Sequence, residues 1–210
     1  MPHDDFEIEP VKGLPERPPE GEEILWQGKP SPFALARESL NLYWVAGYFV
    51  LLAAWRFVSV VDLMPLGQSI AATLPMVILG LVVCGLLYLV AFIQARATVY
   101  TITSARVAMR IGAALTLTLN LPYRELGNAA LDLRRDGTGT IVFDTTGAIK
   151  LSYLVIWPHA RPWRFGATQP ALRCIPDAAR VADILSDAAE ARVNVPQVVR
   201  DAPLGAVAAE

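Results

Sequence analysis

Residues 69–93, SIAATLPMVILGLVVCGLLYLVAFI, form an apolar run without one charged side chain, and this run restricts the fold more than any other feature. As a helix rising about 1.5 Å per residue, it is long enough to cross a hydrocarbon core of about 30 Å. A second apolar run, residues 43–64, contains only Arg56 and Asp62 as charged residues. The sequence therefore predicts two transmembrane helices, residues 43–64 and 69–94. A helical pair buried in a soluble core is the less favoured alternative.

Only residues 65–68, Pro-Leu-Gly-Gln, separate the two runs, so the helices are expected to be antiparallel neighbours that form a membrane hairpin. This short loop carries no Lys or Arg. Basic residues instead flank the hairpin on both sides: Lys29, Arg37, Arg96, Arg106 and Arg110. Because Lys and Arg gather in cytoplasmic segments, this distribution predicts that both termini lie in the cytoplasm.

The charge is distributed unevenly along the chain, which has 18% charged residues and a net charge of -2. Residues 1–30 are acidic and rich in proline and are predicted to form a cytoplasmic arm, of which residues 1–21 are expected to be extended rather than packed. Ser31 followed by Pro32 is typical of a helix start, and residues 31–42 are predicted to form an interfacial helix that leads into the first span. Residues 193–210 are interpreted as a flexible tail. The nearly neutral balance disfavours a nucleic-acid binder.

Residues 96–192 change to a pattern typical of β-strands, with alternating polar and apolar side chains and many β-branched residues. Asp136-Gly137, between two such runs, indicates a hairpin turn. About seven antiparallel strands are expected: residues 98–102, 106–111, 114–121, 129–134, 140–145, 149–157 and 170–175. Residues 22–27 are left open as a short strand or an interfacial piece. A predicted helix over residues 177–192 is apolar on one face. The predicted fold is therefore a membrane α-helical hairpin with a cytoplasmic β-barrel or sandwich closed by a C-terminal helix, which resembles the pleckstrin-homology (PH) architecture.

No catalytic constellation is recognisable in the sequence. The chain has two histidines and two cysteines, and it lacks the HExxH, GxSxG, P-loop and CxxC spacings. We therefore expect a non-enzymatic protein without a metal site, and an enzyme is the least favoured functional class.

Residues 157–165, WPHARPWRF, concentrate aromatic, cationic and proline residues more densely than any other stretch. This composition is typical of a rigid loop that docks on anionic lipid headgroups or on a membrane partner. The alternative is structural, with prolines that end a strand and tryptophans that cover the core. The candidate contact residues in this stretch are Trp157, His159, Arg161, Trp163 and Arg164.

Three residues of the hairpin are further candidates for membrane or partner contacts. Arg56 lies inside the first predicted span, where a charged side chain either reaches toward the outer surface or pairs with a partner. Gly80 and Cys84, together with Gly85, form a patch of small residues where another helix can approach closely.

Several longer segments carry a resemblance to a known family. They are HDDFEIEPVKGLPE near the amino terminus, GEEILWQGKP at residues 21–30, the hairpin, RRDGTGTI at 134–141, IWPHARPWRF at 156–165 and QPALRCIPDAARVADIL at 169–185. Over nearly all of residues 1–190 the chain resembles the PuhB-type photosynthetic complex assembly proteins of purple bacteria. The WPHARPW stretch is the most specific match, whereas GEEILW also resembles general bacterial PH-domain membrane proteins. The family has no catalytic residues to carry over.

This resemblance implies a non-enzymatic factor that helps to assemble the photosynthetic reaction centre with its light-harvesting 1 ring in the bacterial inner (intracytoplasmic) membrane. It implies newly inserted subunits of both complexes and membrane lipids as partners, leaves a second copy of the chain open, and implies no nucleic acid. No cofactor is expected. A neutral His159 could contact the magnesium of bacteriochlorophyll, although a hydrogen-bonded loop residue is the favoured alternative. The competing function is a general PH-domain membrane protein that binds anionic headgroups or senses the envelope.

Overall fold

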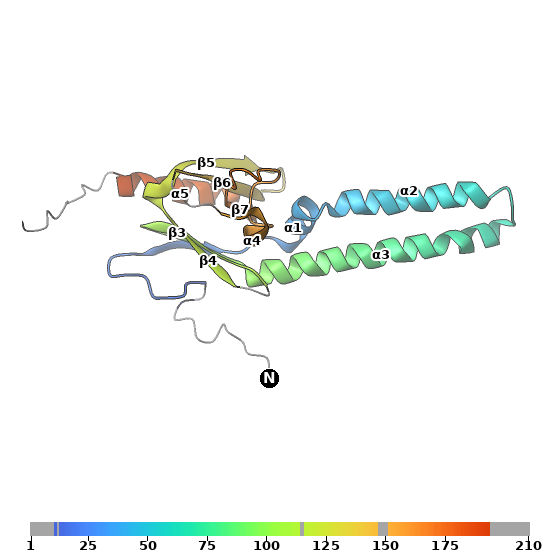
Figure 1. Ribbon diagram of the computed structural model, residues 1–210, viewed down its shortest axis with the longest axis horizontal. Coiled ribbons are helices and arrows are strands. Elements are labelled where there is room, and N and C mark those ends of the chain that lie inside the picture. Colours follow the sequence, from blue (N-terminus) through green and yellow to red (C-terminus); the bar gives the residue numbers. More distant parts are fainter. Residues whose placement is uncertain (1–10, 12, 114–115, 147–150, 194–210) are drawn as a thin grey trace, which may run out of the picture.

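Two long antiparallel helices project from one end of a smaller folded domain (Figure 1). The computed structural model of the 210-residue chain describes residues 11, 13–113, 116–146 and 151–193. Helix α2 spans Leu42–Val60 and helix α3 spans Leu66–Ala97, and both are long and apolar enough to cross a membrane. The predicted apolar hairpin is therefore confirmed, although α2 ends at Val60 rather than at residue 64.

Close packing between α2 and α3 depends on a glycine. A Cβ atom added at Gly80 would lie 2.7 Å from the Cβ of Phe49, closer than two such atoms can approach. At the turn, the Ser69 hydroxyl donates to the Val60 carbonyl at 3.3 Å and joins the start of α3 to the end of α2. Only 6% and 11% of the residues in the most apolar stretches of α2 and α3 are buried. This exposure suits a hairpin whose apolar side chains are covered by hydrocarbon.

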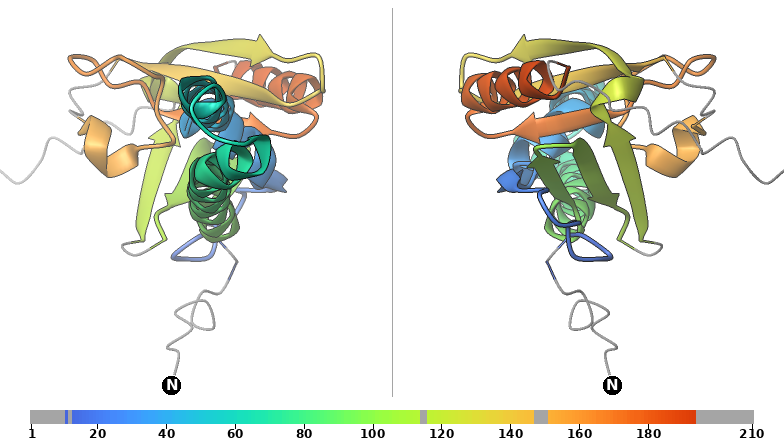
Figure 2. Two further views of the ribbon diagram at one scale, coloured as in Figure 1. Left: turned by 90° about the vertical axis from the view of Figure 1, so that its right-hand side faces the viewer. Right: turned by 90° about the vertical axis from the view of Figure 1, so that its left-hand side faces the viewer.

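Within the described residues, the domain contains seven antiparallel strands in two sheets, which agrees with the predicted number. The first sheet has the order β1 (Ile24–Gly28), β2 (Val99–Thr103), β3 (Arg106–Ile111) and β4 (Leu117–Pro122). The second sheet has the order β5 (Leu126–Leu133), β6 (Gly139–Thr145) and β7 (Ala171–Ile175). A short 3-10 helix, Tyr123–Glu125, connects the two sheets. Figure 2 shows the sheets along the hairpin axis, with α5 lying against them.

Apolar side chains from both sheets and from α5 form one core. Helix α5, Ala178–Val193, contacts strands of both sheets, and the face predicted from its spacing is the face that it buries. Val181 and Leu185 on this face are 1% and 5% exposed and pack against Ile141 and Phe143 of β6, among others. The predicted closing helix is therefore confirmed, since α5 covers the core between the sheets and shields it from solvent.

Strand β1 precedes the hairpin in the sequence but lies in the same sheet as β2, which follows the hairpin. The pairing is antiparallel, with Gln27 opposite Thr101 and Gly28 opposite Tyr100. Residues 22–27, left open between a strand and an interfacial piece, thus contribute to a strand. The segments on the two sides of the hairpin are therefore held together at one end of the helix pair.

The predicted strand over residues 149–157 is wrong within its described part. Helix α4, Tyr153–Ile156, occupies this region, and the N–H of Ile156 donates to the Ser152 carbonyl at 3.3 Å. A strand would place Leu154 and Ile156 on the same face. Instead Ile156 is buried and Leu154 is 85% exposed, because the helical turn separates the two side chains. Apolar composition alone does not distinguish the two conformations in so short a segment.

The predicted interfacial helix over residues 31–42 corresponds to α1, Pro32–Ser39, and to the first residue of α2. Asn41 separates the helices because its φ of 53° lies in the left-handed region, where a right-handed helix cannot continue. Leu35 is fully buried, whereas Phe33 is 47% exposed. Helix α1 therefore packs on the protein with one side and leaves the other free. Residues 194–210 of the predicted tail and residues 1–10 of the predicted arm lie outside the described residues.

Candidate functional site

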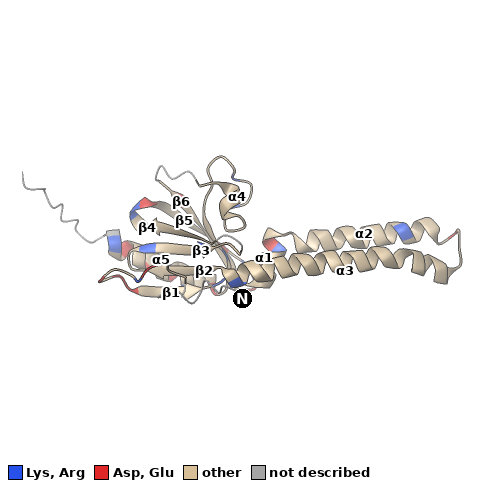
Figure 3. Ribbon diagram, turned by 60° about the horizontal axis from the view of Figure 1, so that its bottom comes forward, with Lys and Arg blue, Asp and Glu red and all other residues tan. Residues whose placement is uncertain are grey.

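The hairpin meets the domain at a junction formed by α1, the C-terminal end of α3, strand β7 and the segment that begins with α4 (Figures 1 and 3). Figure 3 shows that charged residues gather on the domain and at this junction, while the hairpin is almost free of them. The junction is the part of the described chain where a lipid-embedded surface would continue into an aqueous one.

Small side chains let the helices approach the sheet closely at the junction. Ala34, Leu35 and Ala36 of α1 form a buried cluster with Ala91 and Ala95 of α3 and with Cys174 of β7. Each of these side chains is 2% exposed or less. Such packing gives the hairpin a fixed attachment to the second sheet, because close-packed interiors transmit displacement rather than absorb it.

Ion pairs support this attachment from the side of α1. Arg37 lies 3.0 Å from Asp136, in the turn between β5 and β6, and 2.9 Å from Glu38. Arg134 lies 3.2 Å from Glu38. Hydrogen bonds from Thr138, followed by the one from Arg37, lower the pKa of Asp136 to about 2. The carboxylate therefore stays ionised throughout the physiological pH range, and the contact between α1 and the turn persists.

Buried polar groups at the junction are connected by a series of hydrogen bonds. The Tyr100 hydroxyl lies 2.6 Å from Nδ1 of His159, and the Thr98 hydroxyl lies 3.1 Å from Nε2 of the same ring. The Thr98 hydroxyl also donates to the Gln94 carbonyl of α3 at 2.8 Å. The backbone N–H of Arg173 donates to the Tyr100 oxygen at 3.3 Å. These hydrogen bonds join β7, β2 and the loop after α4 to the last turns of α3.

The neutral form of His159 satisfies every contact in this series. Burial, and to a lesser degree the charge of Arg173, lowers the pKa of His159 to about 3. With its proton on Nε2, the ring donates to Thr98 and accepts the Tyr100 proton at Nδ1. Burial also raises the pKa of Tyr100, so its hydroxyl keeps the proton that it donates. We call Thr98, Tyr100, His159 and the Arg173 N–H the junction network.

The junction network leaves His159 no nitrogen for a metal. The residue is 1% exposed and both ring nitrogens have partners. This arrangement matches the alternative of a hydrogen-bonded loop residue and speaks against a contact with bacteriochlorophyll magnesium. Sequence reasoning singled out His159 but missed Thr98 and Tyr100, since nothing in a strand pattern marks a residue that meets a distant loop. No group of three or more His, Cys, Asp or Glu side chains in the described part of the chain is placed to hold a metal ion.

The aromatic loop, residues 157–165, places most of its predicted contact residues in solvent. Trp163 is 83% exposed, Phe165 is 62% exposed, and Trp157 is 39% exposed. Arg161 and Arg164 are also exposed. The loop therefore does not use its tryptophans to cover the core. It presents a mixed aromatic and cationic surface directly beside the buried His159.

Ring contacts and one hydrogen bond give this surface a defined shape. The ring of Phe165 lies 4.7 Å from that of Tyr153 on α4 and 6.2 Å from that of Trp163, centroid to centroid. Arg161 donates to the side-chain carbonyl of Gln169 at 3.1 Å. Leu154, on α4, extends the exposed apolar area. Amphipathic aromatic side chains of this kind are favoured at the boundary between lipid and water.

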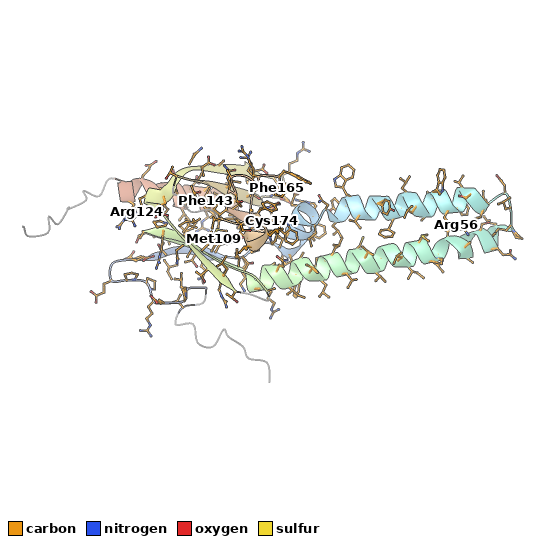
Figure 4. All side chains as sticks on the ribbon, viewed as in Figure 1. Arg56, Met109, Arg124, Phe143, Phe165 and Cys174 are labelled. Atoms are coloured by element: carbon orange, nitrogen blue, oxygen red, sulfur yellow. The ribbon has the colours of Figure 1, made fainter. Side chains whose placement is uncertain are left out.

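The predicted hairpin candidates occupy different surroundings. Arg56 is exposed on α2 near the end far from the domain (Figure 4), four positions or about 6 Å of helix before Val60. In a membrane-spanning hairpin, that distance would let its side chain reach the water boundary. Gly80 contacts Phe49 inside the hairpin, so it is not available to a partner helix. Cys84 is half-buried, and Gly85 faces open space.

Comparison with known proteins agrees with this architecture. A family model described as the bacterial PH domain matches residues 42–189, which include the hairpin and most of the domain. A 23.7 kDa protein of Rhodobacter capsulatus, described as uncharacterized and as lying in the puhA 5′ region, is 47% identical over 209 residues, with 98% of this chain and 97% of that protein covered. No solved structure matches the chain. Because the family model covers more than half of its length, the chain belongs to the bacterial PH domain family.

Proposed function

We propose that this protein is a non-enzymatic, membrane-anchored assembly factor for the photosynthetic reaction centre and its light-harvesting 1 ring. The observation that carries the proposal is the pairing of two uncovered surfaces: the apolar outer face of the hairpin and the exposed aromatic loop at its base. A factor that receives newly inserted helices needs one surface within the lipid and another at the water boundary. The junction network keeps the two in a fixed relation.

We place the hairpin in the inner (intracytoplasmic) membrane, with both termini on the cytoplasmic side. The basic residues that flank the hairpin and the absence of Lys and Arg from residues 65–68 support this orientation. The pairing of β1 with β2 supports it as well, because strands in one sheet must lie on the same side of the membrane.

The proposed identity of the partners rests on the similarity of this chain to other proteins. The chain resembles PuhB-type assembly proteins along nearly its whole length, and the relative in the purple bacterium R. capsulatus is described by its position beside puhA. Helices associate in lipid through close packing and a few polar contacts, since the hydrophobic effect gives no drive between them there. Contacts of this kind are modest and reversible, which suits a factor that must later leave the finished complex.

Affinity purification from growing phototrophic cells tests the proposal directly. Tagged protein, solubilised in mild detergent during induction of the photosynthetic apparatus, should retain reaction-centre or light-harvesting 1 polypeptides, and deletion should lower the accumulation of the complex. The matched control is an equally expressed, tagged protein of the same membrane. Absence of these polypeptides at every stage of induction, together with normal accumulation in the deletion strain, contradicts the proposal.

Substitution of the aromatic loop separates docking from folding. The double variant Trp163→Ala and Phe165→Ala removes two exposed rings and should leave the thermal stability nearly unchanged, while accumulation of the complex falls severalfold. Leu25→Ala on β1, where the residue is 42% exposed and belongs to neither of the two surfaces, is the matched control for loss of an exposed apolar side chain. Equal accumulation in the loop variant and in the wild type would remove the loop from the proposed role.

Exposed arginines in the aromatic loop favour a second candidate, binding of anionic lipid headgroups. Arg161 and Arg164 lie on either side of Trp163, a combination typical of surfaces that meet negatively charged membranes. In nanodiscs that contain phosphatidylglycerol, amide hydrogen exchange in the loop should then be slower than in phosphatidylcholine nanodiscs. The change Arg161→Glu with Arg164→Glu should abolish the difference. Lipid-dependent protection with normal pigment-complex accumulation in the deletion strain would favour this second function over the first.

A further inference from the structure

Strand β5 is an edge strand that lacks the usual protection against pairing. It is the longest described strand, eight residues, and in the described part of the chain it pairs only with β6. Soluble proteins shield such edges with short strands, lysines, prolines or covering elements. The sequence of β5, LGNAALDL, contains one charged residue and no proline, and all but its first residue are exposed. An edge of this kind can form backbone hydrogen bonds with another strand.

The register identifies which backbone groups of β5 are free to pair. In the β5–β6 turn, the N–H of Arg134 donates to the Thr138 carbonyl at 2.9 Å, which marks a hydrogen-bonded pair. Such pairs recur every second residue in an antiparallel ladder, so Asp132 and Ala130 also bond to β6. The N–H and C=O groups of the intervening residues, Ala129, Leu131 and Leu133, therefore point away from β6.

A groove runs between β5 and helix α5, with a volume of about 780 Å³. Apolar side chains from both elements line its floor, among them Leu126, Leu131 and Leu185. Two of the outward-facing residues, Ala129 and Leu131, belong to its wall. The groove thus combines free backbone donors and acceptors with an apolar surface, the two requirements for binding an extended peptide by strand addition.

The rim of the groove is acidic. Asp183 and Glu190 of α5 line it, and both are exposed. No Lys or Arg is among its lining residues. A second copy of the chain is a poor occupant, because its β5 edge would bring Asp132 and no basic side chain to this rim. Charge complementarity instead favours a segment that carries Lys or Arg.

We propose that the groove between β5 and α5 binds an extended peptide segment that presents both apolar and basic side chains on one face, added as a strand to the β5 edge. The choice of partner rests on the proposed function. Cytoplasmic flanks of membrane proteins are rich in Lys and Arg, so the cytoplasmic arm of a newly inserted subunit has the required chemistry. On the face turned toward α5, its apolar side chains contact the floor and its basic side chains meet Asp183 and Glu190 at the rim.

Fluorescence anisotropy with the full-length protein in detergent tests the proposal. The probe is a labelled ten-residue peptide with threonine at every second position and valine and lysine taking turns at the others, so that valine and lysine share one face of the strand. We expect saturable binding with one peptide per chain. A peptide with glutamate in place of lysine should bind at least tenfold more weakly. The change Ala129→Pro removes one outward N–H without touching the ladder to β6, a position where proline is tolerated, and should also weaken binding at least tenfold.

Charge reversals on α5, inside and outside the groove, test the role of the acidic rim. The double variant Asp183→Lys and Glu190→Lys should weaken binding at least tenfold, while Asp187→Lys, on the same helix but outside the groove lining, should leave it unchanged. Circular dichroism verifies that each variant folds. Equal affinity of all variants, or equal affinity for the lysine and glutamate peptides, overturns the proposal.

Hydrogen exchange without peptide tests the other occupants. The amides of Ala129 and Leu131 should exchange rapidly in the free protein. Slow exchange in a monomer means that another segment of the chain covers the edge, and slow exchange in a dimer, sized by light scattering, means that a second copy does. Either result overturns the proposal. Peptide binding in a protein whose deletion leaves pigment complexes normal would retain the groove and refute only the assembly function.

Discussion

Replacing Tyr100 by phenylalanine removes a single oxygen atom from the junction network. That oxygen donates a hydrogen bond to Nδ1 of His159 at 2.6 Å and accepts one from the Arg173 N–H at 3.3 Å, and the side chain is 0% exposed. The change Tyr100→Phe leaves both partners buried, and each unsatisfied group costs about 1–3 kcal/mol, with the longer contact at the lower end. We expect the free energy of unfolding to fall by about 2–3 kcal/mol.

Thermal unfolding of the full-length protein in detergent, followed by near-UV circular dichroism at pH 7.5, measures this loss. For a chain of this length, about 2–3 kcal/mol corresponds to a fall in Tm of about 4–12 °C. Tyr48→Phe is the matched control, since Tyr48 is 57% exposed on α2 and surface changes of this kind stay within about 0.5 kcal/mol. The additional change His159→Leu should make the two effects non-additive, because the residues share one hydrogen bond. A fall in Tm no larger than that of Tyr48→Phe refutes the reasoning.

Three further predictions follow from other contacts. His159 is neutral in the folded protein, where its pKa is about 3, and takes up a proton below about pH 6.5 in the unfolded chain. The free energy of unfolding should therefore decrease by about 2 kcal/mol from pH 7 to pH 5. His159→Gln should flatten this dependence, measured as Tm against pH. Gly80→Val should force the helices apart at Phe49 and lower stability by about 1–3 kcal/mol in thermal unfolding, whereas Gly85→Val, which meets open space, should have little effect. Asp136→Asn removes the charge of one of the two carboxylates that contact Arg37 of α1 and should speed amide hydrogen exchange in α1. Unchanged exchange would show that this ion pair does not hold the helix.

Local patterns were sufficient to predict the hairpin, most strands and the closing helix. An uncharged apolar run has few alternatives to a membrane span, and the alternation around Asp136-Gly137 matches the observed pairing of β5 with β6. The spacing of apolar residues in α5 likewise identified its buried face. In each of these cases the structure follows from residues close together in the sequence.

Predictions stayed open or failed where distant segments decide the structure. Residues 22–27 form part of a strand only because β2 offers them an edge, and β2 lies on the far side of the hairpin. Residues 149–157 are apolar enough for a strand, yet Tyr153–Ile156 close a helical turn beside the buried His159. Apolar composition predicts that such a segment packs but not with which neighbour.

The candidate site was predicted only in part, because some of its contacts join segments that are distant in the sequence. The density of aromatic and cationic residues in the aromatic loop is a local property, and most of these side chains are exposed as a docking surface requires. The roles of Thr98 and Tyr100 depend on a loop about 60 positions away, and the groove beside β5 depends on where α5 lies. An alanine-rich strand gives no sign in the sequence that its edge is left without a neighbour.

The pairing of β1 with β2 across the hairpin has a consequence for biogenesis. In the proposed membrane topology, β1 emerges from the ribosome before either span, and it can join its sheet only after both spans have inserted and β2 has reached the same side of the membrane. Under that topology, a chain that inserted only one span would hold β1 and β2 on opposite sides of the membrane and leave the domain incomplete. Completion of the first sheet thereby reports correct insertion, so a chain with the wrong topology would lack a finished domain and would be open to quality-control proteases.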